Sequence, residues 1–211
     1  MNPDNCDVGM RRICERLQDD LGLDLSSMTA LEFFARDGSW QTAVFANLVK
    51  EVHAWEIDSR FEKDLIANLP ENSKVRIGDS YQIGKEQAFK RKFDMIVFDN
   101  PQGCYGEKYC EHFDALDYIP FLGKEKTTTV VFNVKLSPYD FYSDENKAWR
   151  ERRASFYGLD DTSNLELNFV TSFYKNYFKS MGLEVSFLFS QSRPQESDLF
   201  YVVAGLTGAI N

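Results

Sequence analysis

The stretch at residues 29–40 constrains the fold of this chain more than any other. A short apolar run ends in an acid, Glu32, and a tight turn that contains Gly38 leads into the expected start of a helix. A polar turn between a strand and a helix N-terminus suits the binding of a polar, nucleotide-like group against a parallel sheet. The stretch therefore predicts an α/β fold with a binding site at the end of its first strand.

The same alternation of strand and helix recurs along the chain. Further strands are expected where short apolar or β-branched segments occur, at 52–58, 74–80, 93–99 and 127–136. Helices are expected between several of them, at 39–50, 60–69 and 107–122. The run at 93–99 is apolar nearly throughout, as is typical of a central parallel strand buried on both faces. This order predicts a mostly parallel sheet with helices on both faces.

The C-terminal part of the chain departs from this order. A helix is expected at 166–181, and strands are expected at 183–189 and 199–204. About ten residues, including Pro194, join these two strands, which is too short for a crossover and predicts an antiparallel hairpin. The full prediction is a Rossmann-like α/β fold with a seven-stranded sheet.

Two segments lie outside the alternation. Residues 6–21 carry apolar residues at roughly helical spacing and are expected to form a covering helix at the sheet edge. Residues 137–165 are polar, aromatic and charged, and they read as an insertion with a short helix near 145–155. Since 211 residues with 43% hydrophobic content suffice for one core, residues 1–211 are expected to form a single domain.

Composition limits the kinds of partner and compartment. A net charge of −9 argues against a large footprint on nucleic-acid phosphates, although it allows a local basic patch. No apolar run approaches the roughly 18 to 20 residues of a membrane span, and no signal-peptide pattern is found at the N-terminus, so a cytoplasmic protein is expected. Cysteine and histidine spacings fit no zinc pattern; reduced thiols and no metal are expected for Cys6, Cys14, Cys104 and Cys110.

The turn after the first expected strand has a recognisable pattern. Glu32, Phe34, Ala35 and Gly38 fit the acid-x-Phe-Ala-Gly-x-Gly turn of class I S-adenosylmethionine-dependent methyltransferases that modify amino groups of nucleic-acid bases. Arg36 stands where that family usually has glycine. The resemblance implies that Glu32 contacts the amino-acid end of S-adenosylmethionine, directly or through water. Arg36 either narrows the pocket or meets the cofactor carboxylate.

Two later strand ends also resemble this family, and the whole resemblance covers roughly residues 25–205. Glu56 and Ile57 belong to a segment similar to the family's apolar-Glu-x-Asp, in which the glutamate accepts both ribose hydroxyl protons. Asp79 and Ser80 are similar to the segment that meets the adenine amino group. Any one acid at a strand end is common in loops, whereas acids at three successive strand ends point to a cofactor site.

The fourth segment follows the strand at 93–99 and resembles the Asn/Asp-Pro-Pro-aromatic motif of amino methyltransferases. An exocyclic amino group is a poor nucleophile until a side-chain oxygen and a backbone carbonyl accept its protons, while an aromatic ring stacks on the base. Asp99 or Asn100 would be the side-chain acceptor, and the Pro101 carbonyl the second. The second proline and the aromatic residue are replaced here, so Tyr105 would supply the ring. Asp99 also borders the expected cofactor site.

The sequence thus predicts an S-adenosylmethionine-dependent methyltransferase that acts on an amino nitrogen, with a nucleic-acid base as the acceptor. A small-molecule acceptor is the alternative, because the chain is acidic and has no separate recognition domain. A non-catalytic methyltransferase-like partner subunit is the alternative of another class. The insertion at 137–165 is expected to border the acceptor pocket, with its basic and aromatic residues either facing the acceptor or forming a solvated helix. The sequence does not predict the oligomeric state.

Overall fold

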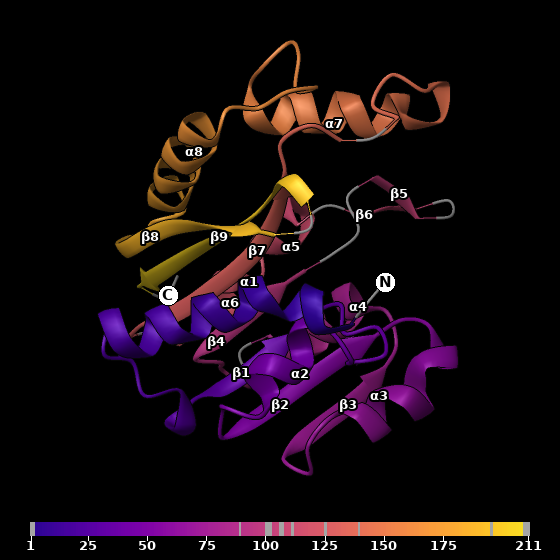
Figure 1. Ribbon diagram of the computed structural model, residues 1–211. Coiled ribbons are helices and arrows are strands. Elements are labelled where there is room, and N and C mark those ends of the chain that lie inside the picture. The colour runs from indigo at the N-terminus through magenta and orange to yellow at the C-terminus, as the bar shows by residue number, and fades with distance from the viewer. Residues whose placement is uncertain are drawn as a thin grey trace.

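A seven-stranded sheet organises the computed structural model, which describes residues 3–88, 90–99, 103–105, 108–110, 112–124, 126–138, 140–194 and 196–208. The strands of this sheet are β1 (Thr29–Glu32), β2 (Glu51–Glu56), β3 (Ser73–Ile77), β4 (Met95–Phe98), β7 (Thr128–Lys135), β8 (Glu184–Arg193) and β9 (Glu196–Thr207). Their order across the sheet is β3-β2-β1-β4-β7-β9-β8 (Figure 1). Only β9 runs antiparallel to its neighbours. The predicted mostly parallel sheet with a C-terminal antiparallel hairpin is confirmed.

Helices cover both faces of the sheet, as predicted. One face carries α1 (Pro3–Glu15), which continues as a π-helical turn at Arg16–Asp20, together with α2 (Gln41–Ala46) and α3 (Glu62–Asn68). The other carries α4 (Ser80–Gln87), α5 (Phe113–Leu116), α6 (Ile119–Leu122), α7 (Lys147–Tyr157) and α8 (Leu167–Ser180). Because side chains alternate along a strand, Ala30 and Ala54 pack with the first group, and Leu31 and Trp55 pack with the second. Within the described ranges, every helix is too short or too polar to cross a membrane.

The single helix expected at 107–122 is wrong. The described part of this stretch holds β6 (Lys108–Cys110), which pairs with β5 (Gly103–Tyr105) in a separate antiparallel hairpin, and then the short helices α5 and α6. Pro120 lies in the first turn of α6 and has no N–H to donate to the preceding turn, so the helical run is interrupted there.

Two further helices differ from the prediction. The helix expected at 39–50 is shorter, because α2 ends at Ala46 and Asn47 turns back to donate a side-chain hydrogen bond to the Ala43 carbonyl at 2.7 Å. The helix α4 was not predicted from the sequence. It is a short and mostly polar helix with Gly84 in its interior, where glycine disfavours a helix.

The hairpin of β8 and β9 carries a bulge that is accommodated by Gly205. Two residues of β8, Ser186 and Phe187, lie opposite this one position of β9. A Cβ atom on Gly205 would stand 2.3 Å from the Phe187 ring and 2.6 Å from the Ser186 hydroxyl oxygen. Glycine is therefore required here by close packing.

We predict that Gly205→Ala lowers the free energy of unfolding by about 2 kcal/mol, because the added methyl overpacks the bulge. The measurement is a urea denaturation midpoint at unchanged slope. Adding Phe187→Ala removes the nearest ring and is expected to recover part of the loss, as coupled neighbours do. A Gly205→Ala protein as stable as the wild type would show that the hairpin register differs from the one described.

Candidate cofactor site at the strand ends

Four acids gather at one edge of the sheet. Glu32 is the last residue of β1, Glu56 is the last residue of β2, Asp79 follows β3, and Asp99 follows β4. These strands are parallel, so their carboxyl ends share an edge. The chain continues from β1 towards β2 but from β4 towards β7, so the connections after these two neighbouring strands diverge, and their shared end is the switch point where open α/β sheets bind ligands.

The turn after β1 is fastened to the end of β2 by backbone hydrogen bonds. The Ala35 N–H donates to the Trp55 carbonyl at 2.9 Å, and the Arg36 N–H donates to Oε2 of Glu56 at 2.7 Å. Gly38 closes the turn with φ +71°, and its N–H donates to the Ala35 carbonyl at 2.9 Å. A Cβ atom there would stand 2.8 Å from Leu65 of α3. Both its backbone angle and this contact require glycine at position 38.

Arg36 has the left-handed backbone that suits the family's usual glycine, with φ +51°. Its side chain is exposed, and the guanidinium lies 4.5 Å above the Trp40 ring and 5.7 Å from that of Phe61. Such cation–π contacts contribute roughly 0.5 to 1 kcal/mol at exposed sites. The two aromatic rings thus offset a strained backbone at the residue that departs most from the motif.

Glu56 has the position expected of a ribose-binding acid. Its Oε1 accepts the Asp58 N–H at 2.8 Å and its Oε2 accepts the Arg36 N–H, so the buried carboxylate is held at the strand end by backbone donors. Each oxygen keeps a second lone pair for a ligand hydroxyl. Ile57 beside it is 50% exposed, so its side chain is accessible to a ligand at this strand end.

The segment after β3 caps a helix. Asp79 accepts the Tyr81 N–H at 2.9 Å and so forms the N-cap of α4. Ser80 is buried, and its hydroxyl donates to the Phe33 carbonyl at 2.6 Å, which ties α4 to the turn after β1. Phe34 is half-buried against Tyr81, with ring centroids 6.1 Å apart. The Ser80 hydroxyl thus supports the turn, while Asp79 stays nearer to solvent.

Asp99 is the most constrained acid at this edge. Its Oδ1 accepts from Asn133 of β7 at 2.6 Å, and its Oδ2 accepts from the Tyr201 hydroxyl of β9 at 2.6 Å. Arg193, at the end of β8, places Nη1 3.5 Å from Oδ1. The Asp99 side chain is only 5% exposed. Asp99 therefore joins the end of β4 to the three strands that follow it across the sheet.

Glu32 is fully buried next to Asp99, at 0% exposure. Its carboxyl accepts from the Phe34 N–H at 3.4 Å and from the Thr42 hydroxyl at 3.3 Å, and both distances are long for hydrogen bonds. Burial, followed by the charge of Asp99, raises the pKa of Glu32 well above its usual value. Burial and Asp99 likewise raise the pKa of Tyr201 well above its usual value, which keeps its hydroxyl a donor.

The structure describes the residues expected at the acceptor site only in part. Asn100 and Pro101 lie outside the described residues, and of Tyr105 only the backbone is described, within β5. The insertion begins and ends at the carboxyl end of β7, since the Leu165 N–H donates to the Leu136 carbonyl at 2.9 Å. The hairpin of β5 and β6 lies beside the turn at Asp144–Asn146 of this insertion, below α7 in Figure 1. The segments after β4 and β7 thus meet above the strand ends.

The basic residues of the insertion are largely used within the protein. Arg153 is fully buried at 0% exposure and donates to the Lys135 carbonyl at 2.6 Å. Arg152 pairs with Asp114, and Arg150 donates to the Phe141 carbonyl at 2.5 Å. The observed α7 lies close to the predicted helix at 145–155, but only part of its positive charge faces solvent.

Sequence reasoning missed the contacts that Asn133, Arg193 and Tyr201 make with Asp99. The pairing of β7 with β9 puts Asn133 directly opposite Tyr201. Knowledge of the register between β7 and β9 would therefore have brought both residues to the end of β4. Arg193 was placed in a loop, whereas it is the last residue of β8.

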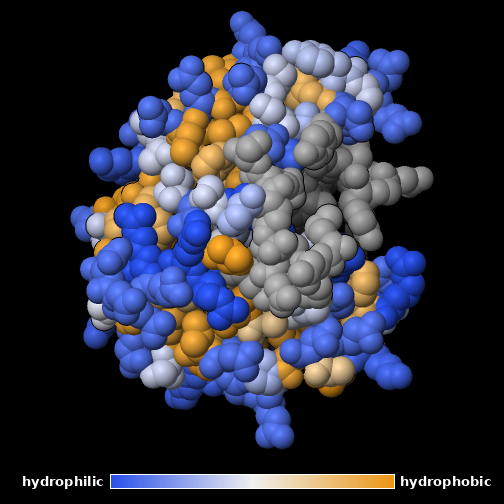
Figure 2. Space-filling model, viewed as in Figure 1, coloured by the Kyte–Doolittle hydropathy of each residue, from blue (hydrophilic) through white to orange (hydrophobic). Residues whose placement is uncertain are grey.

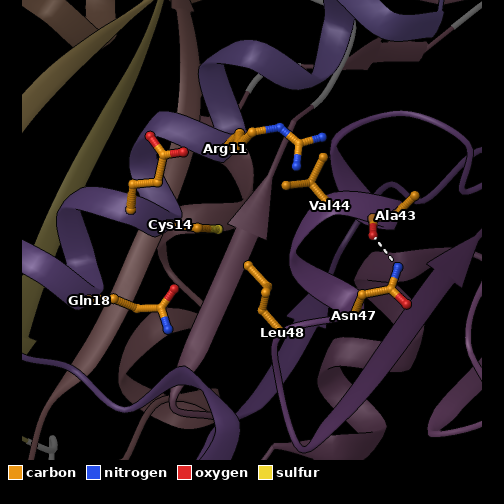
Figure 3. A pocket seen from close by; sticks show the side chains of 8 residues that line it. Arg11, Cys14, Gln18, Ala43, Val44, Asn47 and Leu48 are labelled. Atoms are coloured by element: carbon orange, nitrogen blue, oxygen red, sulfur yellow. Dashed lines mark hydrogen bonds between the residues drawn. The ribbon is translucent and has the colours of Figure 1, made fainter.

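Two cavities lie away from the strand ends. One of about 370 Å³ separates α1 from α2 and the residues after it, and Figure 3 shows Arg11, Cys14, Asn47 and Leu48 around it. Cys14 is a buried free thiol whose pKa burial raises to about 12, as a structural thiol requires. The other, of about 520 Å³, borders Phe173 of α8, where Figure 2 shows apolar surface. In the described part of the chain, no group of three His, Cys, Asp or Glu residues is placed to hold a metal.

The sheet order, the reversed strand β9 and the glycine turn after β1 together define the fold of the class I S-adenosylmethionine-dependent methyltransferases. No family model matches the sequence, and no curated protein matches it. Solved structures do match the fold. They include an Escherichia coli protein described as a methyltransferase, with 11% identity, a TM-score of 0.54, and coverage of 94% of this chain and 86% of that one.

Two further structures are similar to the same extent. A Pyrococcus horikoshii protein described as an RNA methyltransferase has 16% identity and a TM-score of 0.53, over 95% of this chain and 84% of that one. TYW2 of M. jannaschii, solved in complex with AdoMet, has 13% identity and a TM-score of 0.53, over 98% of this chain and 77% of that one. At these identities, the likeness establishes the fold.

The backbone strain at Arg36 can be measured with two variants. Arg36→Gly and Arg36→Ala both remove the contact with Trp40, but only alanine keeps a Cβ atom at φ +51°. We predict that the glycine variant is more stable than the alanine variant by about 1 kcal/mol. Urea denaturation of both proteins checks this difference. Equal stabilities, or a more stable alanine variant, would contradict a strained residue 36.

Proposed function

We propose that this protein is an S-adenosylmethionine-dependent methyltransferase that transfers a methyl group to an amino nitrogen. One observation carries the proposal: Glu32, Glu56 and Asp79 end or follow three parallel strands at the switch point of a class I methyltransferase fold, around the turn closed by Gly38. Residues 1–211 then form a single methyltransferase domain, and the protein acts in the cytoplasm.

Each residue of the donor site has a chemical task in this proposal. Glu56 accepts hydrogen bonds from the ribose hydroxyls, Ile57 covers one face of the adenine, and Asp79 receives the adenine amino group. Glu32 faces the ammonium end of the donor, and the backbone of Phe34 and Ala35 shapes the turn around it. Ser80 supports this turn from behind through its bond to the Phe33 carbonyl. S-adenosylmethionine supplies the activated methyl group, so the chain mainly has to align the reactants.

For the acceptor, we propose a nucleic-acid base. Its amino protons would be accepted by the Asn100 side chain and the Pro101 carbonyl, with Tyr105 as the stacking ring. The carboxylate of Asp99 is already held by Asn133, Tyr201 and Arg193, so Asp99 is better suited to fixing this turn than to taking a proton. Similarity to a Pyrococcus horikoshii protein described as an RNA methyltransferase supports this substrate class.

A small-molecule acceptor is the second candidate, and two observations favour it. The chain carries a net charge of −9, and Arg152 and Arg153 of the insertion are bound to Asp114 and to the Lys135 carbonyl. Few cations of α7 are therefore left for phosphates. A third candidate is a non-catalytic subunit that binds a partner, which the departure at Arg36 favours. The three candidates differ in donor binding and in the acceptor that is methylated.

Donor binding is measured by titration calorimetry with S-adenosylmethionine. We predict that Glu56→Gln weakens the affinity at least about tenfold, because a neutral amide replaces the carboxylate that accepts from the ribose, and hydrogen bonds to charged groups contribute roughly 1.5 to 3 kcal/mol. The exposed Glu71→Gln is the matched control and is expected to bind as the wild type does. Absence of binding heat and of a thermal shift in the wild type would refute both enzyme candidates.

Methyl transfer to the acceptor is measured with labelled S-adenosylmethionine and with short RNA, short DNA and small amines as acceptors. We predict that Asn100→Ala keeps donor affinity and lowers turnover roughly 100-fold, as loss of one polar group at a reacting centre does. On a nucleic-acid acceptor, binding weakens as salt increases. Methylation of small amines alone, without salt dependence, would instead identify the second candidate. Unchanged turnover of Asn100→Ala would remove residue 100 from the acceptor site.

A further inference from the structure

The two acids Glu32 and Asp99 form a buried carboxyl pair with unequal surroundings. We propose that Arg193, reaching from the end of β8, keeps the negative charge of this pair on Asp99, so that Glu32 holds a proton until the ammonium group of S-adenosylmethionine binds and the proton is released. Arg193 is then a positioning residue for the donor site. This inference rests on the proposed function, since it needs a cationic donor at Glu32.

The hydrogen bonds of Asp99 favour its ionised form. An amide N–H from Asn133 and a phenol from Tyr201 both donate at 2.6 Å, from two different strands. Arg193 adds a positive charge 3.5 Å away, and its own side chain is nearly buried, so solvent screens the pair little. Donors and an opposite charge stabilise a carboxylate and hold its proton off.

The surroundings of Glu32 favour its protonated form. The Thr42 hydroxyl and the Phe34 N–H donate to it at long range, and the backbone of Asp99 adds a third hydrogen bond; all three favour the carboxylate, but burial and the charge of Asp99 outweigh them. The ionisable groups that face it are Asp99 after β4, Tyr201 on β9 and, through Asp99, Arg193 on β8. Among the described residues, no cation pairs with Glu32 itself. Two neighbouring buried carboxyls cannot both ionise without cost, and the one without a cation keeps the proton.

The donor, S-adenosylmethionine, brings positive charge to the pair of Glu32 and Asp99. S-adenosylmethionine has an ammonium, a sulfonium and a carboxylate, a net charge of about +1 at neutral pH. When the ammonium meets Glu32, the O–H bond of the carboxylic acid breaks, the electron pair stays on Glu32 and the proton passes to the buffer. Two carboxylates and Arg193 then carry a net charge of −1 against the donor. S-adenosylhomocysteine has no sulfonium charge, so the same pair favours the donor over the product.

Proton release is measured by titrating S-adenosylmethionine into the full chain in buffers of different ionisation enthalpy, from about pH 5.5 to 8.5. We expect up to about one proton to be released per donor bound at the acid end, decreasing as Glu32 ionises before binding. Glu32→Gln keeps the shape of the side chain and removes the titrating group. It is expected to bind more weakly with no proton release.

The role of Arg193 is measured by the pH profile of donor affinity. Arg193→Met removes the positive charge that Arg193 supplies to the carboxyl pair and is expected to shift the profile upward by about one unit or more, whereas Arg193→Lys restores it in part. Arg16→Met, which removes a surface ion pair with Asp20, is the matched control and is expected to leave the profile unchanged. A general loss of stability would lower affinity at every pH without shifting the profile.

The outcomes separate this inference from the proposed function. No binding of S-adenosylmethionine at any pH would refute both. Binding with the same enthalpy in all buffers, or proton release that persists in Glu32→Gln, would overturn only the inference, while the donor site would stand. If Arg193→Met does not fold, the pH profile of Arg193→Lys tests the role of Arg193, and Glu32→Gln still tests the titrating group.

Discussion

The position of β1 between β2 and β4 is the constraint on which the rest of the molecule depends. The chain leaves β1 towards β2 and leaves β4 towards β7, so the loops that follow these two neighbouring strands diverge at their carboxyl ends. All four residues of β4 and most of β1 are buried, and Glu32 of β1 pairs with Val97 of β4. The side chains of Glu32 and Asp99 are thereby brought beside each other at the strand ends, both buried.

The sequence predicted those parts of the fold that follow from local pattern. Apolar runs with acids at their ends located β1, β2 and β4, and with them Glu32, Glu56 and Asp99. Local pattern did not predict α4, whose short polar sequence contains Gly84. It also predicted one helix at 107–122, where Pro120 interrupts the helical run. The contacts of Asp99 depend on the register of β7 with β9. That register is set over a long sequence separation, and no local pattern reports it.

The turn after β1 shows two solutions to the same backbone requirement. Gly38 adopts φ +71° and leaves room for Leu65, so no other residue fits. Arg36 also has a left-handed backbone, but it is exposed, and its guanidinium contact with Trp40 offsets part of the strain. A departure from a sequence motif is therefore tolerated where the side chain can reach a partner. It is excluded where the Cβ atom itself has no space.

The place of β9 in the sheet bears on how the protein folds. This strand lies between β7 and β8, although both precede it in the sequence, so β8 has no partner in the sheet until β9 is made. Tyr201 on β9 also completes the contacts of Asp99. During synthesis, the Rossmann-like half can form around β1 and β4 first, while the edge of β7 stays open to wrong pairing. The candidate site is then the last part of the fold to become ordered.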